Sequence, residues 1–282
     1  MCRIFGFRSV IHSQVHQSLV QAENALSNQS ERHPDGWGVA YYVGESPHII
    51  KGEQKAMEDS IFKKVSGVVA SQTVLAHIRK ATHGDINILN SHPFQYGRWT
   101  FCHNGNVKDF GQYRDQVMSR IDPELRRFIL GETDSETLFY FILTHLKQDL
   151  NLNDPSLKAS DVNERTKFAL REFIDIVGPC NFENPNLFSD TFLTFIITNG
   201  QLMLAHNGGQ RLRYSTHKTK CVDRDSCAFF APVCEAPSTN GFVNHLIISS
   251  EDLSGDNIWT DMAPHEIIGV DKNMSLFKDF LY

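Results

Sequence analysis

Residues 1–7 read MCRIFGF and place a cysteine directly after the initiator methionine, at the start of a short apolar run. The run predicts a buried strand. We expect Met1 to be removed because a small residue follows it, and Cys2 would then carry both a thiol and a free α-amine. Such an amine titrates at about 7.7–8.0, so it can take the thiol proton and later return it to a leaving amine. At any other position, Cys2 would be interpreted as an ordinary buried thiol.

The rest of the chain alternates between strand and helix patterns. Residues 44–47 and 198–201 have the composition of hairpin turns, and Thr133 or Asp134 can cap the helix that follows them. The predicted strands are residues 2–10, 39–43, 48–51, 74–78, 99–103, 191–198, 202–206 and 243–249, and the predicted helices are 14–28, 134–150 and 161–177. Strands, then helices, then strands again predict an α+β fold with two sheets between helical layers.

The composition narrows the classes of partner. The chain has 282 residues and a formal net charge of -6, which argues against a protein that binds a nucleic-acid backbone. No apolar run is long enough to predict a membrane span, and the first residues are too quickly polar for a secretion signal, so a cytoplasmic protein is expected. The six cysteines form no C-x-x-C pair and the thirteen histidines are scattered. We therefore expect no metal, no cofactor and a small-molecule substrate.

Three further parts of the sequence fit acyl transfer from an amino-acid-like substrate, which carries a carboxylate and an ammonium group. Residues 103–106 read HNGN, where the Asn104 side chain and the Gly105 N–H could both donate to an oxyanion; a simple hairpin turn is the alternative. Arg79 follows a predicted strand and could bind a carboxylate with two hydrogen bonds. Asp134 could accept an ammonium group, although a helix cap is the plainer interpretation.

Six segments, in this order along the chain, resemble the class II glutamine amidotransferases of the Ntn-hydrolase fold. The segments are residues 1–6 (MCRIFG), 32–38 (RHPDGWG), 77–84 (HIRKATHG), 90–94 (NSHPF), 103–105 (HNG) and 131–136 (GETDSE). The resemblance implies a four-layer αββα sandwich and a single glutamine amidotransferase domain over residues 2–282. We expect the amidase part alone, without an appended synthase domain.

The resemblance also implies a role for each matching residue. Cys2 would be the nucleophile, Asn104 and Gly105 would form the oxyanion hole, Arg79 would bind the substrate carboxylate and Asp134 its α-amine. Supporting positions are implied as well: Thr82 and His83 would line the same pocket, Arg32 would fix a loop over Cys2, and His92 would order the loop before Pro93.

Over its whole length the chain is most similar to the free-standing YafJ-like subgroup, which includes an amidohydrolase of ergothioneine synthesis. This similarity implies hydrolysis of glutamine or a γ-glutamyl compound through a γ-glutamyl thioester. The alternatives are a glutaminase subunit that delivers ammonia to a separate synthase or acceptor subunit, and a catalytically silent Ntn-fold binding module. Residues 147–190 look longer or more variable than the segments around them, and residues 221–238 match no segment of the family.

Overall fold

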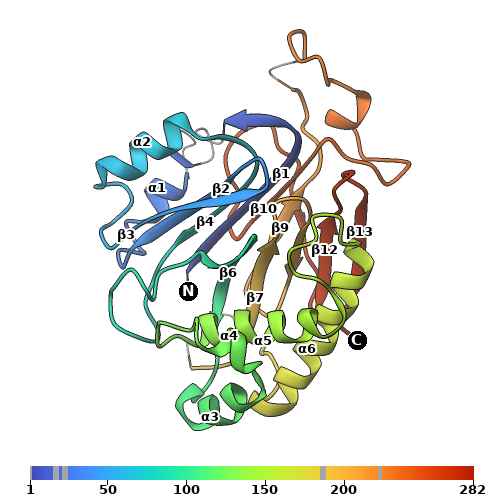
Figure 1. Ribbon diagram of the computed structural model, residues 1–282. Coiled ribbons are helices and arrows are strands. Elements are labelled where there is room, and N and C mark those ends of the chain that lie inside the picture. Colours follow the sequence, from blue (N-terminus) through green and yellow to red (C-terminus); the bar gives the residue numbers. More distant parts are fainter. Residues whose placement is uncertain (1, 15–18, 21–24, 185–188, 222–223) are drawn as a thin grey trace.

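The protein is a sandwich of two antiparallel sheets with helices on both outer faces (Figure 1). The computed structural model describes residues 2–14, 19–20, 25–184, 189–221 and 224–282. The seven-stranded sheet has the order β11 (Thr260–Asp261), β9 (Arg213–Ser215), β10 (His245–Ser249), β1 (Arg3–Gln14), β4 (Ala70–Ile78), β2 (Trp37–Val43), β3 (Ser46–Gly52). The six-stranded sheet has the order β13 (Leu276–Phe280), β12 (Glu266–Val270), β8 (Met203–His206), β7 (Phe192–Thr198), β6 (Trp99–Asn106), β5 (Phe94–Tyr96).

Two groups of helices complete the four layers. Figure 1 shows α1 (Leu26–Gln29) and α2 (Ser60–Val68) outside the seven-stranded sheet. Outside the six-stranded sheet lie α3 (Phe110–Arg120), α4 (Pro123–Arg126), α5 (Asp134–Asp149) and α6 (Ala159–Val177). The predicted α+β class and the αββα sandwich are therefore confirmed. Residues 15–18 and 21–24 of the predicted helix 14–28 lie outside the described residues.

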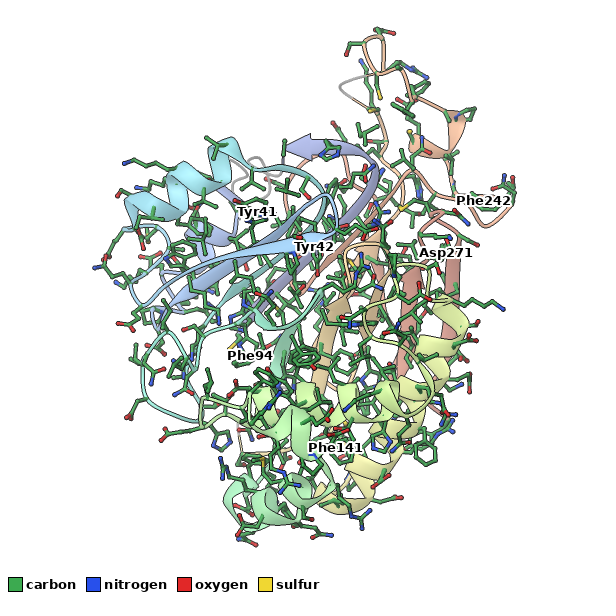
Figure 2. All side chains as sticks on the ribbon, in the orientation of Figure 1. Tyr41, Tyr42, Phe94, Phe141, Phe242 and Asp271 are labelled. Atoms are coloured by element: carbon green, nitrogen blue, oxygen red, sulfur yellow. The ribbon has the colours of Figure 1, made fainter. Side chains whose placement is uncertain are left out.

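Alternation along β1 divides the core into layers. Ile4 lies between the sheets with Leu75 and Ile196, whereas its neighbour Phe5 faces outward and packs in the same cluster as Phe62 of α2. Successive side chains of a strand point to opposite faces, so Cys2 shares the inner face with Ile4. A third cluster, with Phe141 of α5 fully buried in it, fills the space between the six-stranded sheet and its helices (Figure 2).

Tyr42 connects the two sheets between β2 and β6. Its hydroxyl donates to the Arg98 carbonyl at 2.7 Å and lies 3.0 Å from the Thr100 hydroxyl. The turn after β7 packs on the same ring, because a Cβ at Gly200 would lie 2.3 Å from Tyr42 and the residue has φ of +87°. Only glycine combines that close approach with a positive φ, which explains the predicted hairpin at residues 198–201.

Two predictions about α5 and β6 have different outcomes. Thr133 is the cap of α5, since its hydroxyl accepts from the Glu136 N–H at 3.2 Å. The alternative interpretation of residues 103–106 as a hairpin turn is wrong: β6 continues to Asn106, and Asn104 pairs with Thr194 of β7. Pairing along the whole of β7 outweighs the local turn preference of Asn-Gly. None of the helices in the described residues is long and apolar enough to cross a membrane.

Lys51 of β3 places an ammonium group between the sheet edges. Burial lowers its pKa from 10.5 to about 8, and its Nζ donates to the Ser91 carbonyl at 2.5 Å. A lysine whose pKa is depressed on folding destabilises the folded state while it is charged. This loss of stability decreases as the pH rises from about 8 to 10.5. Lys51→Met should therefore raise the free energy of unfolding at pH 7 by about 1 kcal/mol, after the lost hydrogen bond is allowed for.

Thermal unfolding of wild type and Lys51→Met at a series of pH values measures this difference. The gain in melting temperature should be a few degrees at pH 7 and should shrink above pH 8. Lys63→Met, on the exposed face of α2, is the matched control and should give no pH-dependent gain. A Lys51→Met protein that is less stable than wild type at pH 7 would contradict the argument.

Candidate active site

Cys2 lies at the entrance of β1, with its sulfur against the main chain that follows β4. Its Sγ accepts from the Lys80 N–H and can donate to the Lys80 carbonyl, both at 3.3 Å. The residue is 8% exposed, and burial raises the pKa of the thiol, with Arg79 acting to lower it and Asp134 to raise it. The thiol is therefore protonated at neutral pH and needs a base before it can attack.

The loop that precedes β2 holds the main chain beside this sulfur. The Arg79 N–H donates to the Gly36 carbonyl at 2.8 Å, and the Ala81 N–H donates to the Asp35 carboxylate at 2.8 Å. Gly36 has φ of +119°, and a Cβ there would lie 2.8 Å from the Gly52 carbonyl oxygen, so this position requires glycine. Asp35 and Gly36 belong to the quoted segment 32–38, but nothing in the local sequence pattern indicates their bonds to residues 79–81.

Arg79 is buried, and its guanidinium organises the loop that follows it. Nη1 donates to the Asp85 carbonyl at 3.0 Å and Nη2 to the His83 carbonyl at 3.1 Å. Burial lowers the pKa of Arg79. Within the described residues no carboxylate lies within 4 Å of the guanidinium, so its remaining N–H groups are free of an internal counter-ion.

Asp134 is the first residue of α5, and its carboxylate faces the end of β6. Oδ2 accepts from the Val107 N–H at 2.7 Å, and Oδ1 accepts from the Ser135 N–H at 2.7 Å. His83 Nε2 lies 4.0 Å from Oδ2. Because Thr133 caps the helix, Asp134 is released from that role and its buried charge is directed at the strand that carries Asn104.

Asn104 faces the same inner layer as Cys2. Its neighbour two residues back, Cys102, packs with Ile4 in the cluster between the sheets, and β-strand alternation places Asn104 on that side. Asn104 is 2% exposed and its Oδ1 is buried without a hydrogen-bond partner. No hydrogen bond from its side-chain amide to any described residue is found, so the amide N–H groups are available to an oxyanion.

Gly105 has no room for a side chain. A Cβ would lie 2.0 Å from His103 Nε2 and 2.1 Å from the Phe192 carbonyl oxygen. His103 is fixed beneath it: Nδ1 lies 2.8 Å from the Ser135 hydroxyl and Nε2 lies 2.9 Å from the Phe192 carbonyl. His103 was not predicted as a site residue, and its role follows only from the pairing of β6 with β7.

Thr82 and His83 line an open cavity of about 580 Å³ together with Asn106 and the first turn of α3. Asn106 was not predicted; its Nδ2 donates to the Asp190 carbonyl at 3.0 Å. The structure thus brings the predicted pair Thr82 and His83 to one hollow at the end of β6, but the other predicted site residues, Cys2, Arg79, Asn104 and Asp134, are not among the residues that line it. In the described part of the chain, no group of three or more His, Cys, Asp or Glu side chains is placed to hold a metal ion.

Arg32 and His92 differ in their surroundings: Arg32 is exposed, whereas His92 is buried. Arg32 is exposed and lines a shallow pocket with Arg3, whose Nη1 donates to the Cys2 carbonyl at 3.2 Å and whose Nη2 pairs with Glu251 at 2.6 Å. Arg32 itself has no contact with Cys2 among the interactions of the described residues.

His92 is fully enclosed by other rings. It lies 4.1 Å from His77 and 4.6 Å from Phe94, measured between ring centroids, and neither ring nitrogen has a hydrogen-bond partner among the described residues. Burial lowers the pKa of His92 well below its ordinary value, so the ring is neutral at pH 7. This environment fits a residue that orders the main chain before Pro93 by packing.

The comparison with protein families decides the assignment. A family described as class II glutamine amidotransferases matches residues 1–274. The chain belongs to the class II glutamine amidotransferases. It is 27% identical to a putative glutamine amidotransferase of Haemophilus influenzae over 93% of this chain and 81% of that protein. It is 36% identical to the putative glutamine amidotransferase YafJ of Escherichia coli over 52% of this chain and 56% of that protein.

A probable glutamine amidotransferase of yeast extends this set. The chain is 28% identical to the probable glutamine amidotransferase DUG3 of Saccharomyces cerevisiae, over 78% of this chain and 65% of that protein. The predicted family is therefore confirmed.

Solved structures of amidotransferases share the fold. A glutamine aminotransferase class-II domain protein from Silicibacter pomeroyi superposes with a TM-score of 0.60 at 19% identity, over 99% of both chains. The glutamine phosphoribosylpyrophosphate amidotransferase of Bacillus subtilis superposes with a TM-score of 0.62 at 15% identity, over all of this chain and 49% of that chain. The Ntn-type sandwich of this class II glutamine amidotransferase is thus shared with enzymes much more distant in sequence.

Proposed function

We propose that this chain, once processed to begin at Cys2, hydrolyses the γ-amide of glutamine or a γ-glutamyl compound and releases glutamate through a γ-glutamyl thioester. One observation supports this most directly: the buried Cys2 thiol is close enough to a cation and an anion, Arg79 and Asp134, for both charges to act on its pKa. An α-amino acid presents a carboxylate and an ammonium group, and those two charges match the pair around the sulfur.

Each step of the proposed reaction uses a group already described. The α-amine of Cys2 takes the thiol proton, and the sulfur attacks the γ-carbonyl carbon. The negative charge that develops on the carbonyl oxygen is stabilised by the Asn104 side-chain amide and the Gly105 N–H. The C–N bond then breaks as the α-ammonium returns the proton to the leaving amine. Water, deprotonated by the same amine, hydrolyses the thioester and frees glutamate and the thiol.

A glutaminase subunit that passes ammonia to a separate synthase is the second candidate. The glutamine phosphoribosylpyrophosphate amidotransferase of Bacillus subtilis supports this candidate. The region that superposes on this chain makes up only 49% of that protein, and the rest of that protein lies outside the shared fold. Both candidates use the same sulfur, oxyanion donors and charged pair. They differ in the leaving amine: a free-standing hydrolase accepts a substituted amide, whereas a glutaminase subunit prefers the unsubstituted amide of glutamine.

The substrate's charged half provides the test. Masking the α-amine or the α-carboxylate leaves Asp134 or Arg79 without its partner, which costs about 2 kcal/mol at such a site, or about 30-fold in rate. We expect γ-glutamyl amides to be hydrolysed at least that much faster than their N-acetyl or α-ester forms, as measured by glutamate release. Asp134→Ala should remove the preference against N-acetylation.

One control variant and two further outcomes decide the test. Asp161→Ala changes an acidic residue in the first turn of another helix, α6, and should leave the preference intact. Rapid hydrolysis of the N-acetyl amide by wild type would refute the assignment of Asp134. Equal rates with glutamine and bulky γ-glutamyl amides would favour the hydrolase over the glutaminase subunit.

A further inference from the structure

A hydroxyl group at the start of α5 has two neighbours but can donate to only one of them. Ser135 is 5% exposed, and its Oγ lies 2.8 Å from His103 Nδ1 and 3.2 Å from Asp134 Oδ1. A serine hydroxyl carries a single proton, so it cannot donate to the ring and to the carboxylate at once. The choice determines how many donors Asp134 already has.

The second ring nitrogen of His103 settles this choice. Nε2 lies 2.9 Å from the Phe192 carbonyl oxygen, which can only accept, so Nε2 carries a proton. Burial lowers the pKa of His103, although Asp134 acts to raise it, and the ring is therefore neutral at pH 7. In a neutral ring with a proton on Nε2, Nδ1 is an acceptor. The Ser135 hydroxyl thus donates to His103, across the shorter of its two distances.

Asp134 is left as a buried carboxylate with room for a donor. It is 2% exposed, and in the described ranges of the chain the only cationic or titratable nitrogen within 4 Å is His83 Nε2, at 4.0 Å from Oδ2. With the hydroxyl turned to His103, Oδ1 accepts only the Ser135 main-chain N–H, at 2.7 Å, among the residues that the structure describes. A carboxylate oxygen has a second lone pair, and a buried one favours a cation as its partner.

We propose that His103 and Ser135 are positioning residues that keep Asp134 Oδ1 open to the α-ammonium group of the substrate. This inference rests on the proposed function, in which Asp134 binds that group. His103 holds the hydroxyl proton away from Oδ1. Without this acceptor the hydroxyl would turn to the carboxylate, occupy one of its acceptor positions and compete with the ammonium group. Neither side chain has to touch the substrate for this effect.

Two substitutions of His103 separate its two hydrogen bonds. Glutamine places an amide nitrogen near the position of Nε2 and leaves no acceptor at that of Nδ1, whereas asparagine places an oxygen near Nδ1. His103→Gln should therefore release the Ser135 hydroxyl to Asp134, and His103→Asn should retain it. The probes are L-glutamate, the product, and glutarate, which lacks the α-amine. Calorimetric titration of protein that begins at Cys2 measures the affinity for each.

The expected result is a loss that a second substitution reverses. His103→Gln should weaken L-glutamate binding about tenfold, the size of one hydrogen bond, and leave glutarate binding unchanged. Adding Ser135→Ala to His103→Gln should restore most of the affinity for L-glutamate, because no hydroxyl remains to compete. Ser135→Ala alone and His103→Asn should both bind L-glutamate nearly as wild type does.

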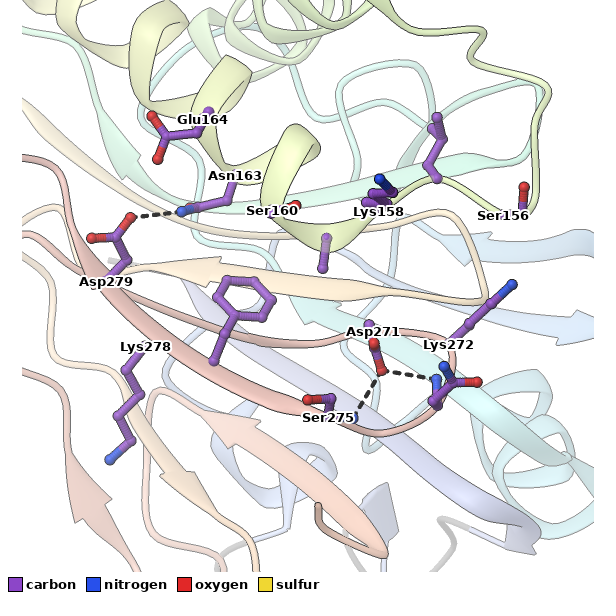
Figure 3. A pocket seen from close by; sticks show the side chains of 14 residues that line it. Ser156, Lys158, Ser160, Asn163, Glu164, Asp271, Lys272, Ser275, Lys278 and Asp279 are labelled. Atoms are coloured by element: carbon purple, nitrogen blue, oxygen red, sulfur yellow. Dashed lines mark hydrogen bonds between the residues drawn. The ribbon is translucent and has the colours of Figure 1, made fainter. Parts of the chain in front are cut away.

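Ser160→Ala is the matched control. Ser160 is the second residue of α6, as Ser135 is of α5, and its hydroxyl donates to Asp161 at 3.1 Å. It lines a separate pocket between α6 and the hairpin of β12 and β13 (Figure 3). The affinity for both probes should therefore stay the same.

The outcomes distinguish this inference from the proposed function. A melting curve checks the folding of each variant, and nitrogen NMR of wild type should show the His103 proton on Nε2 at pH 7; a proton on Nδ1 would overturn the inference. A preference of wild type for L-glutamate over glutarate, with a His103→Gln loss that Ser135→Ala does not reverse, would overturn the inference alone. Equal binding of the two probes by wild type would refute Asp134 as the ammonium acceptor, and the inference with it.

Discussion

Protein that begins at Cys2 should release glutamate from γ-glutamyl amides, whereas folded protein that retains Met1 should do so about 10²–10⁴-fold more slowly, the usual loss when a general base is removed. Burial raises the pKa of the Cys2 thiol, so it does not ionise unaided at neutral pH. Among the described residues, the sulfur bonds only to main-chain atoms of Lys80, neither of which can act as the base. His103 cannot replace the amine, because both its ring nitrogens are engaged.

Mass spectrometry of each preparation, paired with a glutamate-release assay, measures this effect. Circular dichroism and a melting curve should show that the Met1 form is folded. Cys227→Ser, in processed protein, changes a cysteine outside the site and should keep full activity. Full turnover by material shown to retain Met1 would exclude the α-amine as the base.

Asn104→Ala should lower kcat about 10²–10³-fold and leave KM nearly unchanged, as expected when one oxyanion donor is lost. The Asn104 amide has no described partner and faces the layer that contains Cys2, so its N–H groups are free to meet charge that forms only in the transition state. An interaction confined to the transition state affects kcat rather than KM.

Steady-state kinetics on the processed enzyme provides the measurement. Asn106→Ala is the matched control on the same strand, because the Asn106 amide is already engaged with the Asp190 carbonyl; its kcat should fall less than tenfold. If Asn104→Ala raises KM and leaves kcat intact, Asn104 binds the ground state and the oxyanion donor must be another group.

Local patterns predicted those parts of the fold whose causes are local. The helix 134–150 was predictable because Thr133 caps it and its apolar residues recur at helical spacing, and the structure gives Asp134–Asp149. Gly200 marked the β7–β8 turn. By contrast, β11 has only two residues and exists because it pairs with β9, far away in the sequence.

Weak patterns account for other elements that were not predicted. In α3 only Phe110 and Val117 are buried, which is too few to give a helical stripe in the sequence. The strand β13 alternates between half-buried and exposed residues at a sheet edge, and its pairing with β12 fixes it.

The candidate site likewise has residues that could be predicted from the sequence and contacts that could not. Cys2, Arg79, Asn104 and Asp134 were predictable because their residue types fit acyl transfer and the order of the segments resembles a family. The Lys80 main-chain contact with the sulfur and the support of Gly105 by His103 could not be predicted, because they depend on the register of β1 with β4 and of β6 with β7. The assigned roles of these side chains remain predictions.

Cys2, next to the start of β1, and Asn104 of β6, the proposed oxyanion donor, belong to different sheets that pack on a shared inner core. The distance between them therefore depends on the volume of the side chains packed between the two sheets. Gly6 shows how fine the tolerance is, since one added carbon there would already meet Ile196 at 3.0 Å. If Cys2 and Asn104 have the proposed roles, we expect a change in the volume of these core residues to alter the reaction rate as directly as a change in the site itself.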